Sequence, residues 1–177
     1  PDLKQEYNHT IMGHMNLVSP FKNRNLFFYF NAQFTKNKIT NYDLLDQFGV
    51  KRTRPVNVNG VYNISSEISY SRPVRFLKGT IELSSSARLA RTKQFINTVV
   101  NNIKTFSMGP SIRLDMNPAK KLNVAAGAGL EFNRSTYTLQ SALNTTYLSQ
   151  EYNASIDWEL PKRFFFSTDF TYTINSQ

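Results

Sequence analysis

Apolar and polar side chains alternate along eight long segments of this chain, and no other feature restricts its fold as strongly. A period of two places every second side chain on the same face of an extended strand. The clearest segment runs from Val56 to Tyr70, where valine, isoleucine and tyrosine alternate with asparagine, serine and Glu67. The pattern predicts an all-β, antiparallel up-and-down fold of about eight strands, formed by residues 6–17, 26–35, 56–70, 81–89, 105–116, 122–133, 152–160 and 164–174.

The apolar faces of these eight segments contain no aspartate, glutamate, lysine or arginine. A lysine or arginine that faces lipid at the middle of a membrane costs about 2–4 kcal/mol, whereas the lumen of a membrane barrel is polar. The segments reach or exceed the roughly 9–11 residues that a tilted barrel strand needs to cross a membrane. We therefore expect a transmembrane β-barrel segment over residues 1–177, with lipid-facing side chains Phe28, Phe30, Val58, Ile64, Ile68, Leu83, Ile112, Leu114, Val124, Ala126, Leu130, Ile156 and Phe170.

Aromatic and charged residues complete the predicted barrel wall. Tyrosine and tryptophan form girdles at membrane edges, because their rings are apolar and their tips are polar. The expected girdle contains Tyr7, Tyr62, Tyr70, Tyr152, Trp158, Phe164 and Tyr172. The opposite face would line the lumen, with the polar side chains Glu67, Glu82, Arg88, Arg113, Asp115, Glu131, Asp157 and Asp169. We expect the carboxylates of this set to pair with the two arginines across the lumen.

Short and long connections alternate between the predicted strands. Short turns fall at residues 19–23, 71–73, 117–120 and 161–163, and long loops at Asn41–Arg54, Thr92–Asn102 and Thr138–Thr146. Outer-membrane barrels have short turns on one side and longer loops on the other. Pro110 lies inside a segment and has no amide hydrogen for a ladder, so we expect a bulge or a local break there.

The chain offers little for catalysis, for a cofactor or for nucleic acid. It has no cysteine, and its two histidines, His9 and His14, point to opposite faces of one strand and cannot share a metal ion. No helix follows Gly127-Ala128-Gly129, as a phosphate-binding loop would require. The net charge is +9, but the bases lie largely in turns and loops, where lipid phosphates explain them better than nucleic acid. We expect a non-enzyme without cofactor, metal site or nucleic-acid partner.

Two stretches of the chain resemble a known family. The opening Pro1-Asp2-Leu3-Lys4-Gln5-Glu6-Tyr7 resembles the N-P-x-L-K-P-E stretch that begins a late barrel strand in TonB-dependent receptors, with Gln5 where the family usually has proline. The stretch Thr35-Lys36-Asn37-Lys38-Ile39 looks like the Bacteroidetes-type outer membrane protein beta-barrel family, whose members are TonB-dependent-receptor-like. The resemblance implies a location in the cell outer membrane and a 22-stranded barrel with an N-terminal plug.

The resemblance also implies a function for the parent protein. This chain would be an incomplete, C-terminal barrel portion without a plug, and would form barrel wall for the uptake of an unidentified solute. Its partners would be the lipid bilayer, TonB through the plug that this chain lacks, and a surface lipoprotein. We expect an open meander whose first and last strands do not pair with each other.

Two other functions fit the same alternation. The first is a self-contained eight-strand outer-membrane barrel with a structural or adhesive role, which would require the first and last strands to pair. The second is a soluble β-barrel that binds a ligand, which would place the apolar faces inside. Exposure of Phe28, Ile64, Leu114, Val124 and Ile156 separates the two orientations, because lipid-facing side chains are exposed in the isolated chain.

Overall fold

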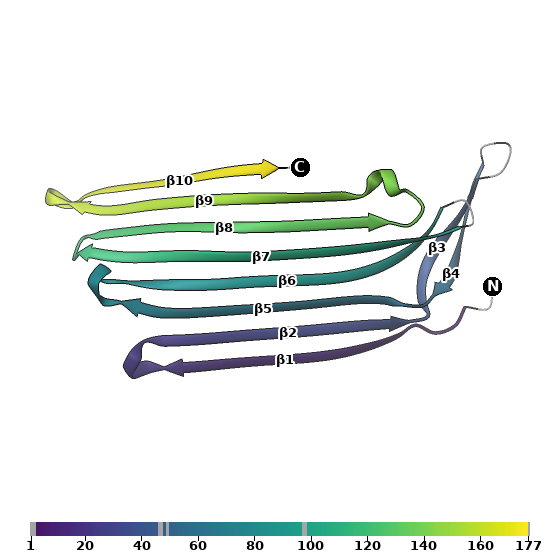
Figure 1. Cartoon of the computed structure of the whole chain (residues 1–177), viewed down its shortest axis with the longest axis horizontal. Coiled ribbons are helices and arrows are strands. Elements are labelled where there is room, and N and C mark those ends of the chain that lie inside the picture. Colours follow the sequence, from purple (N-terminus) through teal and green to yellow (C-terminus); the bar gives the residue numbers. More distant parts are fainter. Residues whose placement is uncertain (1–2, 46–47, 49, 97–98, 177) are drawn as a thin grey trace.

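The computed structural model describes residues 3–45, 48, 50–96 and 99–176. Pro1 and Asp2 of the opening stretch therefore lie outside the described residues. The ten strands are β1 (Tyr7–Ser19), β2 (Arg24–Lys36), β3 (Lys38–Leu45), β4 (Lys51–Val58), β5 (Val61–Val74), β6 (Gly79–Ile96), β7 (Val99–Ala119), β8 (Leu122–Tyr137), β9 (Thr145–Leu160) and β10 (Phe164–Ser176) (Figure 1). The 3-10 turns are η1 (Pro20–Lys22), η2 (Arg75–Leu77), η3 (Ser141–Leu143) and η4 (Pro161–Arg163). In the described part of the chain, no helix could cross a membrane.

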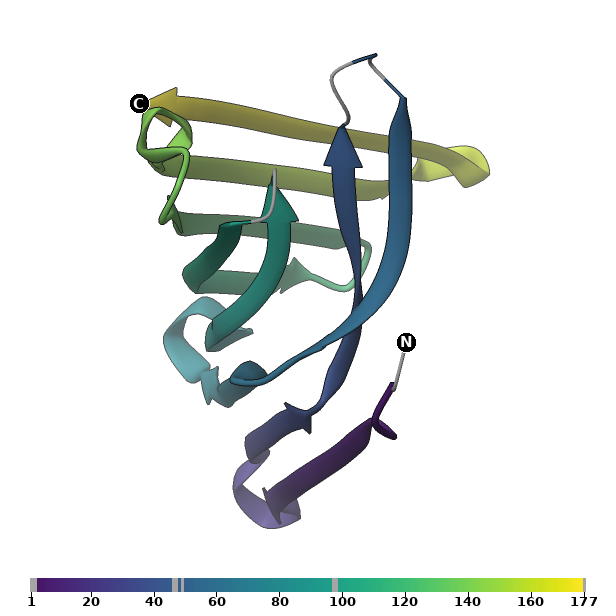
Figure 2. The same cartoon turned by 90° about the vertical axis from the view of Figure 1, so that its right-hand side faces the viewer.

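Eight of the strands form one antiparallel sheet in the order β1-β2-β5-β6-β7-β8-β9-β10. This confirms the predicted all-β, antiparallel up-and-down arrangement. Seen from the side that Figure 2 shows, the sheet curves into an arc that does not close. β1 and β10 are its two edges, and no ladder joins them in the described residues. The expected open meander is therefore present, and a closed eight-strand barrel is not.

The predicted long loop at Asn41–Arg54 is wrong, because most of it forms the hairpin β3–β4. Thr35 pairs with Val61 and Lys38 pairs with Val58, so the β2–β5 register continues into the hairpin unchanged. The chain bends at the junction, where Asn37 has a φ of 54° and Gly60 a φ of 78°. The predicted strand from Val56 to Tyr70 is consequently divided by this bend between β4 and β5. Residues 46–47 and 49, between β3 and β4, lie outside the described residues.

Polar contacts hold the base of the β3–β4 hairpin against the start of the chain. The Asn57 amide bonds to both backbone groups of Lys4, with the Lys4 N–H donating to Oδ1 at 2.7 Å and Nδ2 donating to the Lys4 carbonyl at 2.9 Å. The Glu6 carboxylate accepts from the Ile39 N–H and from Lys38 Nζ, both at 3.0 Å. Both hydrogen bonds lower the pKa of Glu6 below its usual 4.5, and the bond from the Ile39 N–H has the larger effect.

The hairpin contacts β6 beyond the end of β5. The Tyr42 and Phe95 rings lie 5.0 Å apart, and the Arg54 guanidinium lies over Tyr42 at 4.6 Å. Figure 2 shows the hairpin rising from β2 and β5 across the end of the arc. The long-loop end of the sheet is thus partly covered by an ordered element.

One further sequence prediction on β6 and β7 is wrong, and another is confirmed in one of its two forms. The predicted loop Thr92–Asn102 is largely strand, with Thr92 paired to Ile103 and Lys93 to Asn102, while residues 97–98 lie outside the described residues. Pro110 causes no bulge, since β7 keeps the same register to β8 on both sides of it. The expected local break is present instead, because the pairing to β8 is interrupted at Gly109 and Pro110, where proline cannot donate. The register shift on β7 lies instead between Met116 and Ala119.

We expect Gly79→Ala to destabilise the sheet and Gly13→Ala to leave it intact. A Cβ at Gly79 would meet the Asp115 carbonyl oxygen, whereas a Cβ at Gly13 would meet nothing within 4 Å. Overpacking against backbone costs about 1–3 kcal/mol, while alanine at a relaxed site stabilises by roughly 0.4–1 kcal/mol. Urea unfolding of the chain in detergent micelles measures both changes. Equal destabilisation by the two substitutions would contradict the packing at Gly79.

Candidate functional site

The register places the predicted lipid-facing side chains on one face of the eight-stranded sheet, with one exception. A single row across that face joins Leu26, Tyr70, Leu83, Ile112, Ala128, Tyr152 and Tyr172. The exception is Val58, which lies in the β3–β4 hairpin and is buried, with 7% of its surface exposed. Val58 therefore does not face lipid, because the bend at Gly60 removes it from the sheet.

Exposure follows the predicted direction along β9, but not along β8, where Asn123 is exposed and Val124 is half-buried. Along β9, Tyr152, Ala154, Ile156 and Trp158 are exposed, whereas Asn153, Ser155 and Asp157 between them are half-buried. Of the five side chains chosen to separate the two orientations, Ile156 is exposed, at 38%. The other four, Phe28, Ile64, Leu114 and Val124, are half-buried rather than highly exposed. Large neighbours on adjacent strands cover part of these four, but none belongs to a buried core.

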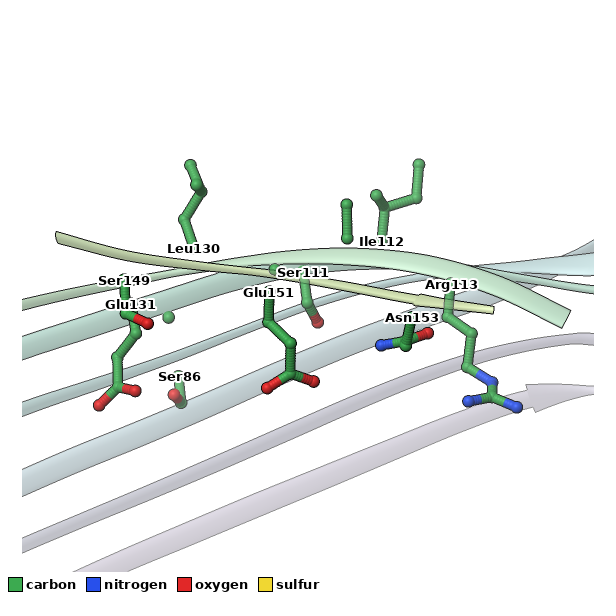
Figure 3. Close-up of a pocket in the computed structure, with 12 residues that line it drawn as sticks. Ser86, Ser111, Ile112, Arg113, Leu130, Glu131, Ser149, Glu151 and Asn153 are labelled. Carbon is green, nitrogen blue, oxygen red and sulfur yellow. The ribbon is translucent and has the colours of Figure 1, made fainter. Parts of the chain in front are cut away.

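The two faces of the sheet differ in curvature as well as in polarity. Figure 3 shows Leu130 and Ile112 pointing to one side of β7 and β8. Ser86, Arg113, Glu131, Glu151 and Asn153 point to the other side, where the ribbons of the first strands pass beneath them. The polar face is therefore the concave one, and the apolar face is convex. A barrel closed with this curvature would have a polar lumen.

The polar side chains predicted for the lumen share the concave face, but they do not pair as expected. Arg113 bonds to Asp115 on its own strand, with Nη2 donating to Oδ1 at 2.8 Å. Arg88 donates from Nε to the Asn63 amide oxygen at 2.8 Å, and Glu82 accepts from Ser69 at 3.0 Å. The prediction of ion pairs across the lumen is wrong, because the sheet is open and these groups find partners along the wall.

A shallow hollow of about 380 Å³ lies on the concave face between β6 and β9. Small residues form its floor, and Arg113, Glu131, Glu151 and Asn153 stand around it (Figure 3). Glu151 was not among the predicted lumen residues. It lies next to the convex-face residue Tyr152 in the strand and therefore points to the concave face, where it pairs with Gly129 of β8. The remaining predicted lumen side chains, Glu67, Asp157 and Asp169, lie on the same face at other positions of the sheet.

Five of the seven residues predicted for the aromatic girdle form two groups. Tyr7 and Tyr62 lie at the long-loop ends of β1 and β5, and Tyr70, Trp158 and Phe164 lie toward the short turns. Tyr152 and Tyr172 pair with each other inside β9 and β10 rather than at their ends. The Tyr152 hydroxyl donates to Gln150 Oε1 at 2.9 Å, which satisfies its polar tip within the apolar face.

On the convex face, an uncharged belt crosses the sheet from β2 to β8, and basic residues border it at both ends on these two strands. On β2 the belt covers residues 26–34, between Arg24 and Lys36. On β8 it covers residues 122–132, between Lys120 and Arg134. These lengths are nine and eleven residues, and a tilted strand needs roughly 9–11 residues to cross the hydrocarbon of a membrane.

The belt runs obliquely to the strands. The row through Phe30, the middle of the belt on β2, passes Ser66, Ala87 and Met108 and reaches β8 at Phe132. The middle of the belt on β8 is residue 127, so the belt shifts by five residues over four strand spacings. This is about 17 Å along the strands over about 19 Å across them. The strands therefore tilt by roughly 40° from the normal of the belt, and outer-membrane barrel strands tilt by about 35–45°.

Comparisons with protein families, with curated proteins and with solved structures gave no match for this chain. His9 and His14 lie on opposite faces of β1, since His9 pairs with Phe34 and His14 with Tyr29. Within the described residues, no group of three or more potential metal ligands occurs.

Proposed function

We propose that this chain is a section of the wall of an outer-membrane β-barrel transporter, with lipid on its convex face and the lumen on its concave face. The tilt of the uncharged belt is the observation that carries the proposal. A soluble sheet has no reason to hold its charge-free residues in a band of membrane thickness at the tilt of a barrel strand. The bases at both margins of the belt would lie beside lipid phosphates.

The open sheet supports a large barrel over a small one. A closed eight-strand barrel fills its interior with side chains and leaves no path for a large solute. Here β1 and β10 each pair on one side only, so further strands are needed to satisfy their free backbone groups in lipid. The TonB-dependent-receptor-like resemblance supplies such strands, and with them the plug, TonB and surface lipoprotein as partners of the whole transporter.

The soluble ligand-binder has less support. That function needs an apolar interior, whereas the hollow of the concave face is bordered by Arg113, Glu131, Glu151 and Asn153. The exposed side chains of Tyr152, Ala154, Ile156 and Trp158 along β9 would then face water on the convex side. Apolar patches of this extent on a protein surface mark contact with a membrane or another protein.

Quenching of the single tryptophan, Trp158, tests the proposal. Its side chain is 46% exposed on the convex face, so brominated phospholipid in refolded vesicles should strongly quench its fluorescence. A matched probe is Ser155→Trp in a Trp158→Phe background, which places tryptophan on the concave face of the same strand. That variant should be quenched by aqueous acrylamide and little by the brominated lipid. Equal lipid quenching of both probes, or of neither, would refute the proposed orientation.

A further inference from the structure

Five basic side chains gather at the long-loop margin of the belt, on the convex face. We refer to Lys36, Arg91, Lys93, Lys104 and Arg134 as the basic margin. Arg91 lies directly opposite Lys104, and Lys93 lies opposite Asn102. Lys36 borders the belt on β2 and Arg134 borders it on β8. The face positions between them hold Gly60, Tyr62, Asn102 and Thr136, so this margin has no acidic side chain among its described residues.

Two of these cations converge over Gly60. A Cβ at Gly60 would lie 3.6 Å from Lys93 Nζ and 3.8 Å from Arg91 Nη1, so both groups border the space that the missing side chain leaves. Arg91 Nη2 donates to Asn102 Oδ1 at 2.8 Å, which orients the guanidinium. Arg91 Nε has no hydrogen-bond partner among the described residues, so the protein leaves part of this guanidinium unsatisfied.

The basic margin lacks charge compensation. Like charges directly opposite each other on neighbouring strands destabilise a sheet, and Arg91 and Lys104 form such a pair. In the described part of the chain, none of the five bases forms an ion pair with a carboxylate. By contrast, Lys121 and Arg113 elsewhere on the sheet are each paired with an acid. An anion bound at the margin would remove the repulsion between Arg91 and Lys104.

We propose that the basic margin binds the phosphate group of an anionic membrane lipid, whose acyl chains then lie on the adjoining belt. This inference rests on the proposed function, because it requires the belt to be in lipid. Guanidinium groups bind phosphate through paired hydrogen bonds, and lysine adds a mobile point charge. Phe34, Tyr62, Leu89 and Phe106 lie immediately on the belt side of these bases. A head group with attached chains therefore matches the surface better than a free phosphate ion does.

The inference can be tested by calorimetric titration of the chain, held in zwitterionic micelles, with short-chain phosphatidic acid. The variant K36Q/K93Q/K104Q removes three charges but keeps Arg91 and its bond to Asn102. Each base near a lipid head group contributes roughly fivefold in affinity, so we expect this variant to bind phosphatidic acid about 100-fold more weakly. Short-chain phosphatidylcholine should bind the unaltered chain and the variant alike, because its head group has no net charge.

The matched control is K22Q/K78Q/K162Q, which removes three lysines from three separate short turns. The turns that hold these lysines span six strand spacings, or about 29 Å, whereas Lys36, Lys93 and Lys104 span three, or about 14 Å. The control therefore removes no compact site, and affinity should change by less than about threefold. Equal weakening by the two triple variants would overturn the proposal, since binding would then follow total charge. If inorganic phosphate bound as tightly as phosphatidic acid, the proposal that the ligand is a lipid would be refuted.

Trp158 quenching separates failure of this inference from failure of the proposed function. If Trp158 of the unaltered chain is not quenched by brominated lipid, then the belt does not contact lipid and both proposals fail. If Trp158 is quenched but phosphatidic acid binds no more tightly than phosphatidylcholine, only the phosphate site is refuted. Quenching of Trp158 should be the same in K36Q/K93Q/K104Q as in the unaltered chain, because Trp158 lies at the short-turn side.

Discussion

Ala126→Arg should prevent stable insertion of the chain into lipid vesicles. Ala126 is exposed on the convex face, one residue from the middle of the belt on β8. Arginine at the middle of a membrane costs about 2–4 kcal/mol on a barrel strand, which lowers the ratio of inserted to unfolded chain on the order of 30- to 1,000-fold. Arginine at Ile64 should destabilise the inserted chain less, because Ile64 pairs with Leu89, which is one position on the convex face from Arg91 of the basic margin. Urea titration in vesicles measures both costs.

The matched control carries the same arginine on the concave face. Asn123→Arg on β8 places the charge beside the lumen and opposite Asp157 of β9, so insertion should change little. A difference between Ala126 and Asn123 cannot come from total charge or from strand propensity alone, since the strand and the new residue are the same. Equal damage at both positions would show that the assignment of the two faces is wrong.

Disulfide trapping should show that the sheet edges pair between molecules and not within one. The chain has no cysteine, so Gly13→Cys on β1 and Phe170→Cys on β10 introduce the only two thiols. In lipid, each unpaired N–H or C=O of an open edge costs several kcal/mol, and exposed edges recruit further strands. Mild oxidation of the double variant in vesicles should therefore yield dimers and larger species, together with aggregation of the unmodified chain.

The single variants provide the reference for this experiment. Gly13→Cys alone and Phe170→Cys alone can form dimers but no chains of molecules, so ladders of higher species should require both thiols. A monomer whose two thiols are joined to each other would show that β1 and β10 meet in one molecule. That result would establish a closed eight-strand barrel and would remove the need for additional strands.

The sequence alone determined the face of most side chains in the sheet. Alternation is a local property, and a strand obeys it whichever strand lies beside it. For that reason Ile68, Ile112 and Ala126 lie on one face, while Glu131 and Asp157 lie on the other, as predicted. The short turns between β1 and β2 and between β9 and β10 were also predictable, because proline and basic residues interrupt the pattern there. The short turn predicted at residues 71–73 was wrong: Ser71, Arg72 and Pro73 still pair with β6, and the turn follows at η2.

The prediction failed where the chain has charged residues and still remains extended. Lys38 to Leu45 and Lys51 to Val58 look like a polar loop, but they continue the pairing of β2 and β5 beyond a bend. A bend requires a residue that tolerates a positive φ, and Asn37 and Gly60 are such residues. Many asparagines and glycines in this chain do not bend it, so neither identity nor position indicates a bend in advance.

Only the tertiary structure decided what depends on register. Strand pairing sets which residue of β2 lies beside which residue of β8, and the amino-acid sequence of a single strand does not contain that information. The oblique course of the belt therefore became visible only after Phe30 and Phe132 were placed in one row. The basic margin has the same origin, since Arg91 and Lys104 are 13 residues apart in the chain but directly opposite in the sheet.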